Sequence, residues 1–420
     1  MACWLSAGTI TTASAQTLQV IPPRALVDQE VVIRAAGLQP GEQVNIRATL
    51  TDGADHPWAS QAQFVADAQG TVDTSRQAPE KGSYKDVSSM GLVWSMMPAA
   101  KNAAVYRSPR DLSPQNIDFV LLRDAKQIST AQFTQLHVAD GVHSLNIDGQ
   151  IHGVLFIPPD AGPHPGVLVL GGSEGGLPGE KAAWLASHGY AAFALAYFRY
   201  DGLPQQLAGI PLEYFGNALS WMMTRPEVSA DRIAVMGTSR GGELALQLGS
   251  MYPGIKAVVA YVPANVRYPS CCGRPPIRYA WTWHGEPLAY ALPRFAQMTG
   301  AELAAQIAVE RRHGPILVIS GESDAVWPSP TMTQAVVDRL KRAHFLFAVE
   351  RLNFPHAGHL AGRPQIVPSW HGEVRHPVSG QEMSFGGDPK GDAASSLDAI
   401  PKVLAFLQAS LAPKPTPSSQ

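Results

Sequence analysis

The sequence IAVMGTSRGGELALQL, residues 233–248, places a serine between a strand-like apolar run and a helix-like segment. Gly237 and Gly241 stand two residues before and two residues after Ser239, where small residues let the backbone bend sharply. A lone Gly-x-Ser-x-Gly pattern is also common in ordinary glycine-rich turns. Because this one joins an apolar strand to a helix, we interpret Ser239 as a nucleophile on a strand-to-helix turn.

The surrounding region, residues 139–411, contains apolar runs of strand length separated by helix-like segments. Strands that are buried on both faces have this nearly continuous apolar character. Helical crossovers between such strands produce a mostly parallel, doubly wound sheet, so an α/β catalytic domain is predicted. The expected strands are 154–157, 167–170, 191–195, 233–236, 257–260 and 316–319, of which the first is antiparallel, and a last helix is expected over 393–411.

Residues 16–138 have a different pattern, in which short segments alternate apolar and polar side chains. A chain of 420 residues also exceeds what one hydrophobic core usually holds, so a second domain is expected. Gln39-Pro40-Gly41-Glu42 is typical of a turn between strands. We therefore predict an N-terminal β-sandwich, with strands near 31–34, 44–50, 62–65 and 116–123 and a buried aromatic strand or turn at 91–96.

A nucleophilic serine needs a histidine base and a carboxylate that orients the imidazole. In α/β-hydrolases the acid and then the histidine follow the serine, on loops after later strands. Asp324 is the expected acid, because it lies in a polar loop directly after the strand at 316–319. Glu322 in the same loop is the competing candidate. Asp338 is a weaker one, since it lies in a helical pattern.

Two histidines occupy the loop FPHAGH, residues 354–359, which follows a strand-like segment at 345–348. We expect His359 to be the base, because Gly358 permits a tight turn that presents the ring to the serine. His356 remains the alternative. Three other histidines are interpreted as surface loop residues, namely His284, His371 and His376.

Attack on a carbonyl creates an oxyanion that needs hydrogen-bond donors. One expected donor is the backbone N–H of Arg240, the residue after the nucleophile. The second is Gly172 or Ser173, in the loop GGSEGG at 171–176. That loop lacks the complete dinucleotide and P-loop patterns, so no nucleotide site is predicted. The Arg240 side chain is expected to be solvated or structural, with steering of an anionic substrate as the alternative.

Composition argues against several classes of partner. A formal net charge of -2 gives no electrostatic footprint for nucleic acid. No apolar stretch of about 18 residues occurs, so no membrane span is predicted. Neither His-Glu-x-x-His nor paired Cys-x-x-Cys occurs, so neither a metal nor another cofactor is expected.

The chain contains 3 cysteines, too few for a disulfide framework. Adjacent cysteines bridge only with backbone distortion, so Cys271 and Cys272 are expected to be free thiols in a loop. Residues 1–15 form a possible signal or disordered leader, with the cleavage-like Ala13-Ser14-Ala15 but no preceding Lys or Arg. A periplasmic or secreted location is favoured over a cytoplasmic one. A disordered tail is expected at 412–420.

Taken together, these motifs resemble the acyl-CoA thioesterase and bile acid-CoA:amino acid N-acyltransferase family. The likeness extends from about residue 18 to 410 and implies an α/β-hydrolase domain behind a β-sandwich. The implied triad falls on Ser239, Asp324 and His359. Thioesterases of that family carry serine at the nucleophile and the amino-acid transferase carries cysteine, so hydrolysis of acyl-CoA is implied. The segments that carry the likeness are 37–41, 90–94, 195–198, 212–215, 237–244, 357–359 and 386–389.

Two other functional interpretations stay open. A carboxylesterase or acyltransferase of the same fold would act on non-CoA esters, and export would favour it because CoA is scarce outside the cytoplasm. A noncatalytic binding or adhesion protein would use the β-sandwich as its working module. The aromatic segment 267–298 matches the family poorly and is expected to form a cap over the pocket.

Overall fold

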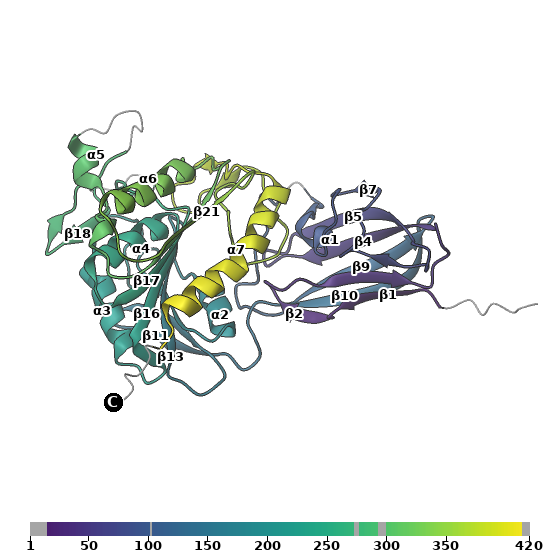
Figure 1. Ribbon diagram of the computed structural model, residues 1–420, viewed down its shortest axis with the longest axis horizontal. Helices are drawn as coiled ribbons and strands as arrows, with labels where there is room; N and C mark the ends of the chain where they lie inside the picture. The colour runs from purple at the N-terminus through teal and green to yellow at the C-terminus, as the bar shows by residue number, and fades with distance from the viewer. Residues whose placement is uncertain (1–14, 101–102, 273–276, 293–299, 414–420) are drawn as a thin grey trace, which may run out of the picture.

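The computed structural model describes residues 15–100, 103–272, 277–292 and 300–413. The leader predicted at 1–15 falls outside this range except for Ala15, and the predicted tail falls outside it after residue 413. In Figure 1 a body of strands on the right adjoins a body of strands and helices on the left.

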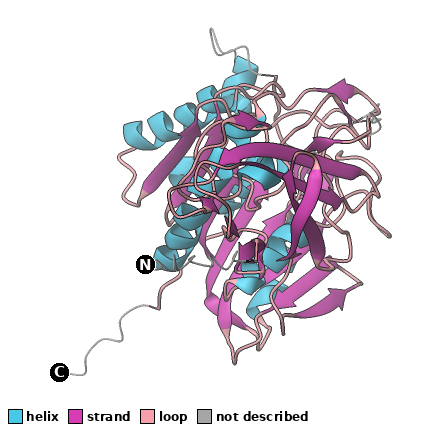
Figure 2. Ribbon diagram, turned by 90° about the vertical axis from the view of Figure 1, so that its right-hand side faces the viewer, coloured by secondary structure: helices cyan, strands magenta, loops and turns pink. Residues whose placement is uncertain are grey.

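The first body contains a three-stranded sheet, ordered β1-β3-β6, and a seven-stranded sheet, ordered β2-β10-β9-β4-β5-β7 with β8 paired to β5. Along β4 the side chains of Val44, Ile46 and Ala48 point inward and their neighbours point outward, which is the predicted alternation. Viewed from this end, strands fill the front of the molecule (Figure 2). The strands are β1 Thr17–Ile21, β2 Arg24–Leu26, β3 Val32–Ala36, β4 Gln43–Thr51, β5 Pro57–Val65, β6 Val72–Asp73, β7 Lys81–Gly82, β8 Met97–Pro98, β9 Gln115–Arg123 and β10 Lys126–Leu136.

One element of this body decides between the two forms predicted at 91–96, a buried aromatic strand or a turn. Residues Gly91–Trp94 form a buried helical turn, α1. The Met90 carbonyl accepts hydrogen bonds from the N–H groups of Val93 and Trp94, which closes the turn. The segment is therefore buried as expected, and it forms the predicted turn, of helical type, in place of the alternative strand.

The second body is built on an eight-stranded sheet, ordered β11-β12-β14-β13-β16-β17-β20-β21. The last six strands in this order run parallel, and β12 runs antiparallel to both of its neighbours, β11 and β14. This arrangement confirms the predicted α/β fold. The strands are β11 His143–Ile147, β12 His152–Ile157, β13 His164–Leu170, β14 Ala191–Ala196, β16 Val228–Thr238, β17 Ile255–Tyr261, β20 Ile316–Gly321 and β21 Val349–Phe354.

Helices cover both faces of this sheet. Helices α2 (Gly179–Ser187) and α7 (Pro389–Ser410) pack on one face, and α3 (Glu213–Met223), α4 (Arg240–Met251) and α6 (Ser329–Arg342) pack on the other. Alternate residues of each strand enter the two cores, so the central strands are apolar on both sides. Among the described residues, no helix is long and apolar enough to cross a membrane. The remaining elements are β15 Ile210–Pro211, β18 Trp281–Trp283, β19 Glu286–Pro287, α5 Gly300–Ala305, the 3₁₀ turn Val309–Arg311, β22 Val374–Arg375 and β23 Glu382–Met383.

Two predicted boundaries shift. Helix α7 begins at Pro389, four residues before the predicted start, because Asp388 caps it by accepting the Gly391 N–H at 2.8 Å. The strand expected at 345–348 lies instead at β21, and residue Leu346 is exposed.

The two bodies are joined next to the loop that carries His359. Asp28 of the sandwich accepts hydrogen bonds from Trp184 Nε1 at 2.8 Å and His188 Nε2 at 2.7 Å, both on or beside α2. The Ile366 N–H donates to the Val27 carbonyl at 2.7 Å. The sandwich therefore supports a segment that begins seven residues after His359.

Candidate active site

Ser239 lies at the turn between β16 and α4, with φ 58° and ψ −119°. Positive φ is uncommon outside glycine and costs about 1–3 kcal/mol, so it persists only where the surrounding structure enforces it. Gly237 and Gly241, on either side of Ser239, each lie so close to another backbone segment that a side chain would not fit. A Cβ at Gly237 would lie 2.0 Å from the Gly241 carbonyl oxygen, and a Cβ at Gly241 would lie 2.3 Å from that of Gly171.

Ser239, His359 and Asp324 form a chain of two hydrogen bonds, with His359 in the middle. The Ser239 hydroxyl lies 2.9 Å from His359 Nε2, and His359 Nδ1 lies 2.8 Å from Asp324 Oδ2. With the Nδ1–H donating to the carboxylate, Nε2 is left as the acceptor for the serine proton. The Asp324 side chain is fully buried, and its Oδ1 accepts the Val326 N–H at 2.9 Å. These contacts fix the carboxylate and, through it, the imidazole.

The competing sequence candidates lie elsewhere. Glu322 is exposed and accepts a hydrogen bond from Asn353 Nδ2 at 2.7 Å. Asp338 accepts one from Gln334 Nε2 at 2.9 Å within α6. His356 is exposed. The structure thus brings Asp324 and His359, and none of the alternatives, to Ser239.

The loop 385–388 connects the loop that carries Asp324 to the loop that carries His359. The His359 N–H donates to the Phe385 carbonyl at 2.8 Å, and Asp324 and Gly386 form an isolated bridge. A Cβ at Gly358 would lie 2.0 Å from the Gly386 carbonyl oxygen. Gly358 is therefore required by close backbone approach, whereas the sequence suggested a tight turn.

The expected oxyanion donors differ in availability. The Arg240 N–H begins α4, where the first turn leaves its amides without intrahelical partners. The Gly172 N–H donates to Glu174 Oε1 at 3.0 Å, so a carboxylate occupies it. Among the described residues, the Ser173 N–H makes no hydrogen bond, while its hydroxyl lies 3.0 Å from His376 Nε2. In this conformation the Ser173 N–H is available to an oxyanion, whereas the Gly172 N–H is not.

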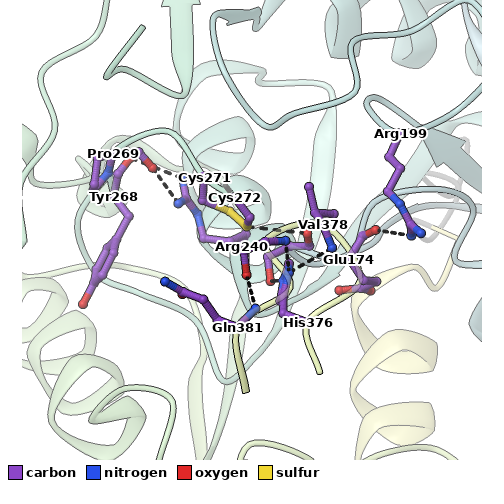
Figure 3. The surroundings of a disulfide bond; sticks show 12 residues. Glu174, Arg199, Arg240, Tyr268, Pro269, Cys271, Cys272, His376, Val378 and Gln381 are labelled. Atoms are coloured by element: carbon purple, nitrogen blue, oxygen red, sulfur yellow. Dashed lines mark hydrogen bonds between the residues drawn. A yellow bond between two sulfur atoms is a disulfide. The ribbon is translucent and has the colours of Figure 1, made fainter. Parts of the chain in front are cut away.

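The side chain of Arg240 is buried and structural, which confirms one half of the expectation of a solvated or structural role, and it is not solvated. Its Nε lies 3.0 Å from Glu243 Oε2, and both side chains are buried. Its guanidinium also donates to the carbonyls of Tyr268 and Pro269, at 3.2 and 2.7 Å (Figure 3). Arg240 thus secures the 268–269 backbone close to Ser239.

Cys271 and Cys272 form a disulfide, with an S–S distance of 2.04 Å (Figure 3). The expectation of two free thiols is therefore wrong. The peptide bond between them is cis, which is the backbone distortion that the sequence argument counted against a bridge. Cys272 Sγ lies 3.8 Å from the Ser173 carbonyl oxygen, so the bridge borders the loop of the expected oxyanion donors.

Two histidines that were interpreted as surface residues are buried. His376 lies beside Ser173, and burial lowers the pKa of its imidazole. The side chain of His371 is 7% exposed, and its Nε2 lies 3.3 Å from Asp392 Oδ2. Neither position has a local signal, because burial comes from segments that pack on them from elsewhere in the chain. His284 is exposed, as expected.

The aromatic segment predicted as a cap contributes a contact to the site. Tyr268 packs against Trp327 with ring centroids 5.0 Å apart, and Trp327 packs edge-on against His359 at 5.6 Å. Parts of the predicted cap, residues 273–276 and 293–299, lie outside the described residues.

A cavity of about 290 Å³ adjoins Thr238 and His359. Lys181 of α2 lines it, donates a hydrogen bond to Thr238 Oγ1, and places Nζ 4.2 Å over the Tyr261 ring. Burial lowers the pKa of Lys181 to about 8. The sequence analysis missed this residue because a lysine on an amphipathic helix resembles a solvated one. Among the described residues, no cluster of His, Cys, Asp and Glu is suited to hold a metal ion.

Comparison with known proteins gives two matching family models. One, described as "BAAT / Acyl-CoA thioester hydrolase C terminal", matches residues 210–413. The other, described as "Acyl-CoA thioester hydrolase/BAAT N-terminal region", matches residues 28–149.

Curated relatives are similar over nearly the whole chain. Acyl-coenzyme A amino acid N-acyltransferase 1 of Mus musculus is 34% identical, over 89% of this chain and 92% of the relative. Acyl-coenzyme A thioesterase 6 of Homo sapiens is 30% identical, over 91% and 94%. Peroxisomal succinyl-coenzyme A thioesterase of Mus musculus is 28% identical, over 93% and 96%.

Proposed function

This chain belongs to the acyl-CoA thioester hydrolase and BAAT family, and we propose that it is a serine hydrolase that cleaves acyl-CoA thioesters. The observation that carries the proposal is the 2.9 Å contact between the Ser239 hydroxyl and His359 Nε2, with Asp324 2.8 Å behind the imidazole. Such an arrangement activates an otherwise weak oxygen nucleophile.

The reaction has two halves. As Ser239 Oγ attacks the thioester carbonyl, His359 Nε2 takes its proton, and the resulting oxyanion is held by the Arg240 N–H and a donor from the 171–176 loop. Collapse of the intermediate breaks the C–S bond, and His359 returns the proton to the departing thiolate. An acyl ester on Ser239 remains.

Water completes the reaction. His359 removes a proton from water as its oxygen attacks the acyl ester, and collapse returns that proton to Ser239 Oγ. The carboxylic acid leaves. Asp324 stays ionised throughout and stabilises the imidazolium that forms twice in each cycle.

The proposed second oxyanion donor is Ser173, because the Gly172 N–H already donates to Glu174. Gly172 would serve only after the Glu174 carboxylate moves away. Removing one oxyanion donor typically costs about 10² to 10³ in turnover, so this choice affects the rate strongly.

A second candidate is acyl transfer to an amine, favoured by the 34% identity to an amino acid N-acyltransferase. The acyl-serine is common to both reactions, and the acceptor alone differs. Product analysis with and without added glycine separates them, since transfer produces an amide and consumes the amine. Hydrolysis of non-CoA esters is separated by rates on matched acyl-CoA and oxygen-ester substrates.

Handling of acyl-CoA would place the protein in lipid metabolism, and this role is part of the proposal. Export through the leader at 1–15 is a separate proposal, supported by the cleavage-like Ala13-Ser14-Ala15. Cell fractionation tests it. Recovery in the cytoplasmic fraction with an intact N-terminus would contradict export and leave the thioesterase proposal standing.

The test of the activity compares wild type with Ser239→Ala on acyl-CoA substrates of short, medium and long chain. We expect hydrolysis to fall by about 10⁴-fold or more, with the fold retained by circular dichroism. Wild-type turnover of acyl-CoA by Ser239→Ala would overturn the proposal.

A further inference from the structure

A second cavity, of about 520 Å³, adjoins the one beside the triad. The two share three lining residues, Glu180, Arg363 and Gln365. These three residues belong to the α/β domain and the other lining residues belong to the sandwich, so the second cavity lies between the two domains. Its other lining residues are Gly53, Ala54, Tyr106, Arg107, Ser108 and Arg110.

The second cavity is strongly cationic. Its lining residues include three arginines, Arg107, Arg110 and Arg363, and a single carboxylate, Glu180. The Glu180 carboxylate accepts a hydrogen bond from Gln365 Nε2 at 2.9 Å. Among the described residues, none of the three arginines lies within ion-pair distance of an acid. The Glu180 and Asp392 carboxylates attract Arg363 from beyond ion-pair distance, and three arginines against one lining carboxylate leave the cavity with a net positive charge.

Arg363 stands where the two cavities meet. Its Nε atom is buried and has no hydrogen-bond partner among the described residues. A buried nitrogen without a hydrogen-bond partner is costly, so the position of this Nε atom calls for an explanation. Arg107 and Arg110, in contrast, are exposed at the sandwich side of the cavity. The three guanidinium groups therefore extend from the rim of the cavity to its inner end.

Guanidinium groups match phosphate oxygens in charge and geometry, and a fork of N–H donors can bind phosphate bidentately. Acyl-CoA carries its thioester at one end of a pantetheine arm and its phosphorylated nucleotide at the other. We propose that the cavity between the domains binds the phosphates of the CoA nucleotide through Arg107, Arg110 and Arg363. This inference rests on the proposed thioesterase function, and it assigns the sandwich a share in substrate binding.

In this arrangement the pantetheine arm enters the first cavity past Arg363 and Gln365. The thioester then reaches the end lined by Thr238 and His359. The apolar wall of the first cavity accommodates an arm that is largely uncharged. Its apolar lining residues are Leu170, Leu177, Pro178, Tyr261, Leu360, Ala361 and Pro364.

The test compares two substrates with the same acyl chain, one an acyl-CoA and the other an acyl-pantetheine without phosphates. The variants are Arg107→Gln, Arg110→Gln and the double substitution. Arg47→Gln is the control, because Arg47 is an exposed arginine of β4 that lines neither cavity. Calorimetry with 3′-phospho-ADP measures binding of the nucleotide without turnover.

We expect the ratio of the acyl-CoA KM to the acyl-pantetheine KM to rise at least about tenfold in the double variant and to stay unchanged in Arg47→Gln. The wild-type ratio should approach that of the double variant at high salt, because exposed charges are screened. Binding of 3′-phospho-ADP should weaken in parallel. Thermal unfolding checks that the variants fold.

A ratio equal to wild type in the double variant, with 3′-phospho-ADP binding intact, would overturn this inference and leave the thioesterase proposal standing. Failure of wild type to cleave either thioester would overturn the thioesterase proposal instead. In that case the calorimetric comparison alone decides whether the arginines bind the nucleotide.

Discussion

Glu243 Oε2 lies 3.0 Å from Arg240 Nε, and both side chains are buried next to the turn that carries Ser239. Glu243 also accepts the Trp281 Nε1–H at 2.8 Å. Burial raises the pKa of Glu243, and the neighbouring Arg240 guanidinium opposes that rise. Arg240, the residue after Ser239, is thus held in place by a carboxylate three positions along the same helix.

Removing Glu243 should destabilise the protein strongly. Glu243→Ala leaves the Arg240 guanidinium buried without its counter-charge, which typically costs about 3–5 kcal/mol of unfolding free energy. Urea unfolding measures the loss. Asp398→Ala is the matched control, because Asp398 forms an exposed pair with Lys402 at four-residue spacing and should change stability by less than about 1 kcal/mol. Equal losses in the two variants would contradict the role of the buried pair.

The choice between the two candidate acids predicts opposite kinetic results. Asp324→Asn removes the acceptor that holds the His359 tautomer, so kcat should fall by about 10³ to 10⁴-fold without loss of fold. Glu322→Gln should leave kcat within about twofold, because Glu322 faces Asn353 and solvent. Steady-state kinetics on an acyl-CoA decides the question. A larger loss of kcat in Glu322→Gln than in Asp324→Asn would identify Glu322 as the acid.

The buried amine of Lys181 predicts a pH dependence of stability. Its pKa is lowered from 10.5 to about 8 in the folded protein, so the unfolded chain binds more protons than the folded one between these values. The unfolding free energy should therefore rise with pH from about 8 to 10 through this group. Lys181→Met removes the group.

The measurement is the difference in unfolding free energy between wild type and Lys181→Met across that range. We expect the unfolding free energy of wild type to rise relative to that of the variant as pH rises. The cost of the buried charge is complete below about pH 8 and declines between about 8 and 10.5, where the unfolded chain holds a proton that the folded protein has lost. A constant difference would mean that the folded-state pKa of Lys181 is not lowered.

Close backbone contact predicts that Gly358 cannot carry a side chain. Gly358→Ala would place a Cβ 2.0 Å from the Gly386 carbonyl oxygen and displace the loop that bears His359. We expect a large loss of kcat together with a lower melting temperature. Gly300→Ala is the control, because a Cβ there meets no atom within 4 Å and the residue begins α5. Wild-type kcat in Gly358→Ala would contradict the tight packing of these loops.

The sequence predicted most of the features that arise from local pattern. Ser239, Asp324 and His359 each follow or lie near the end of a parallel strand of the sheet, and parallel strands deliver their carboxyl ends to one edge. Their meeting therefore follows from order along the chain. Catalytic roles for the three remain part of the proposed function.

What the sequence analysis missed depends on contacts between distant segments. Nothing local to His376 indicates that it will reach Ser173, and nothing local to Arg363 indicates that it will face the sandwich. The free-thiol expectation failed at Cys271 and Cys272 because it used average backbone geometry. Lys181 was missed because burial of one helical lysine depends on what packs over it.

The most direct test of the central claim is chemical labelling of the nucleophile. Wild type is treated with a fluorophosphonate, digested and mapped by mass spectrometry, while residual acyl-CoA hydrolysis is measured on the same sample. The account predicts one phosphonyl group on Ser239, hydrolysis lost in proportion to labelling, and no labelling of Ser239→Ala. Undiminished hydrolysis by fully labelled protein, or a label on another residue that accounts for the lost activity, would contradict it.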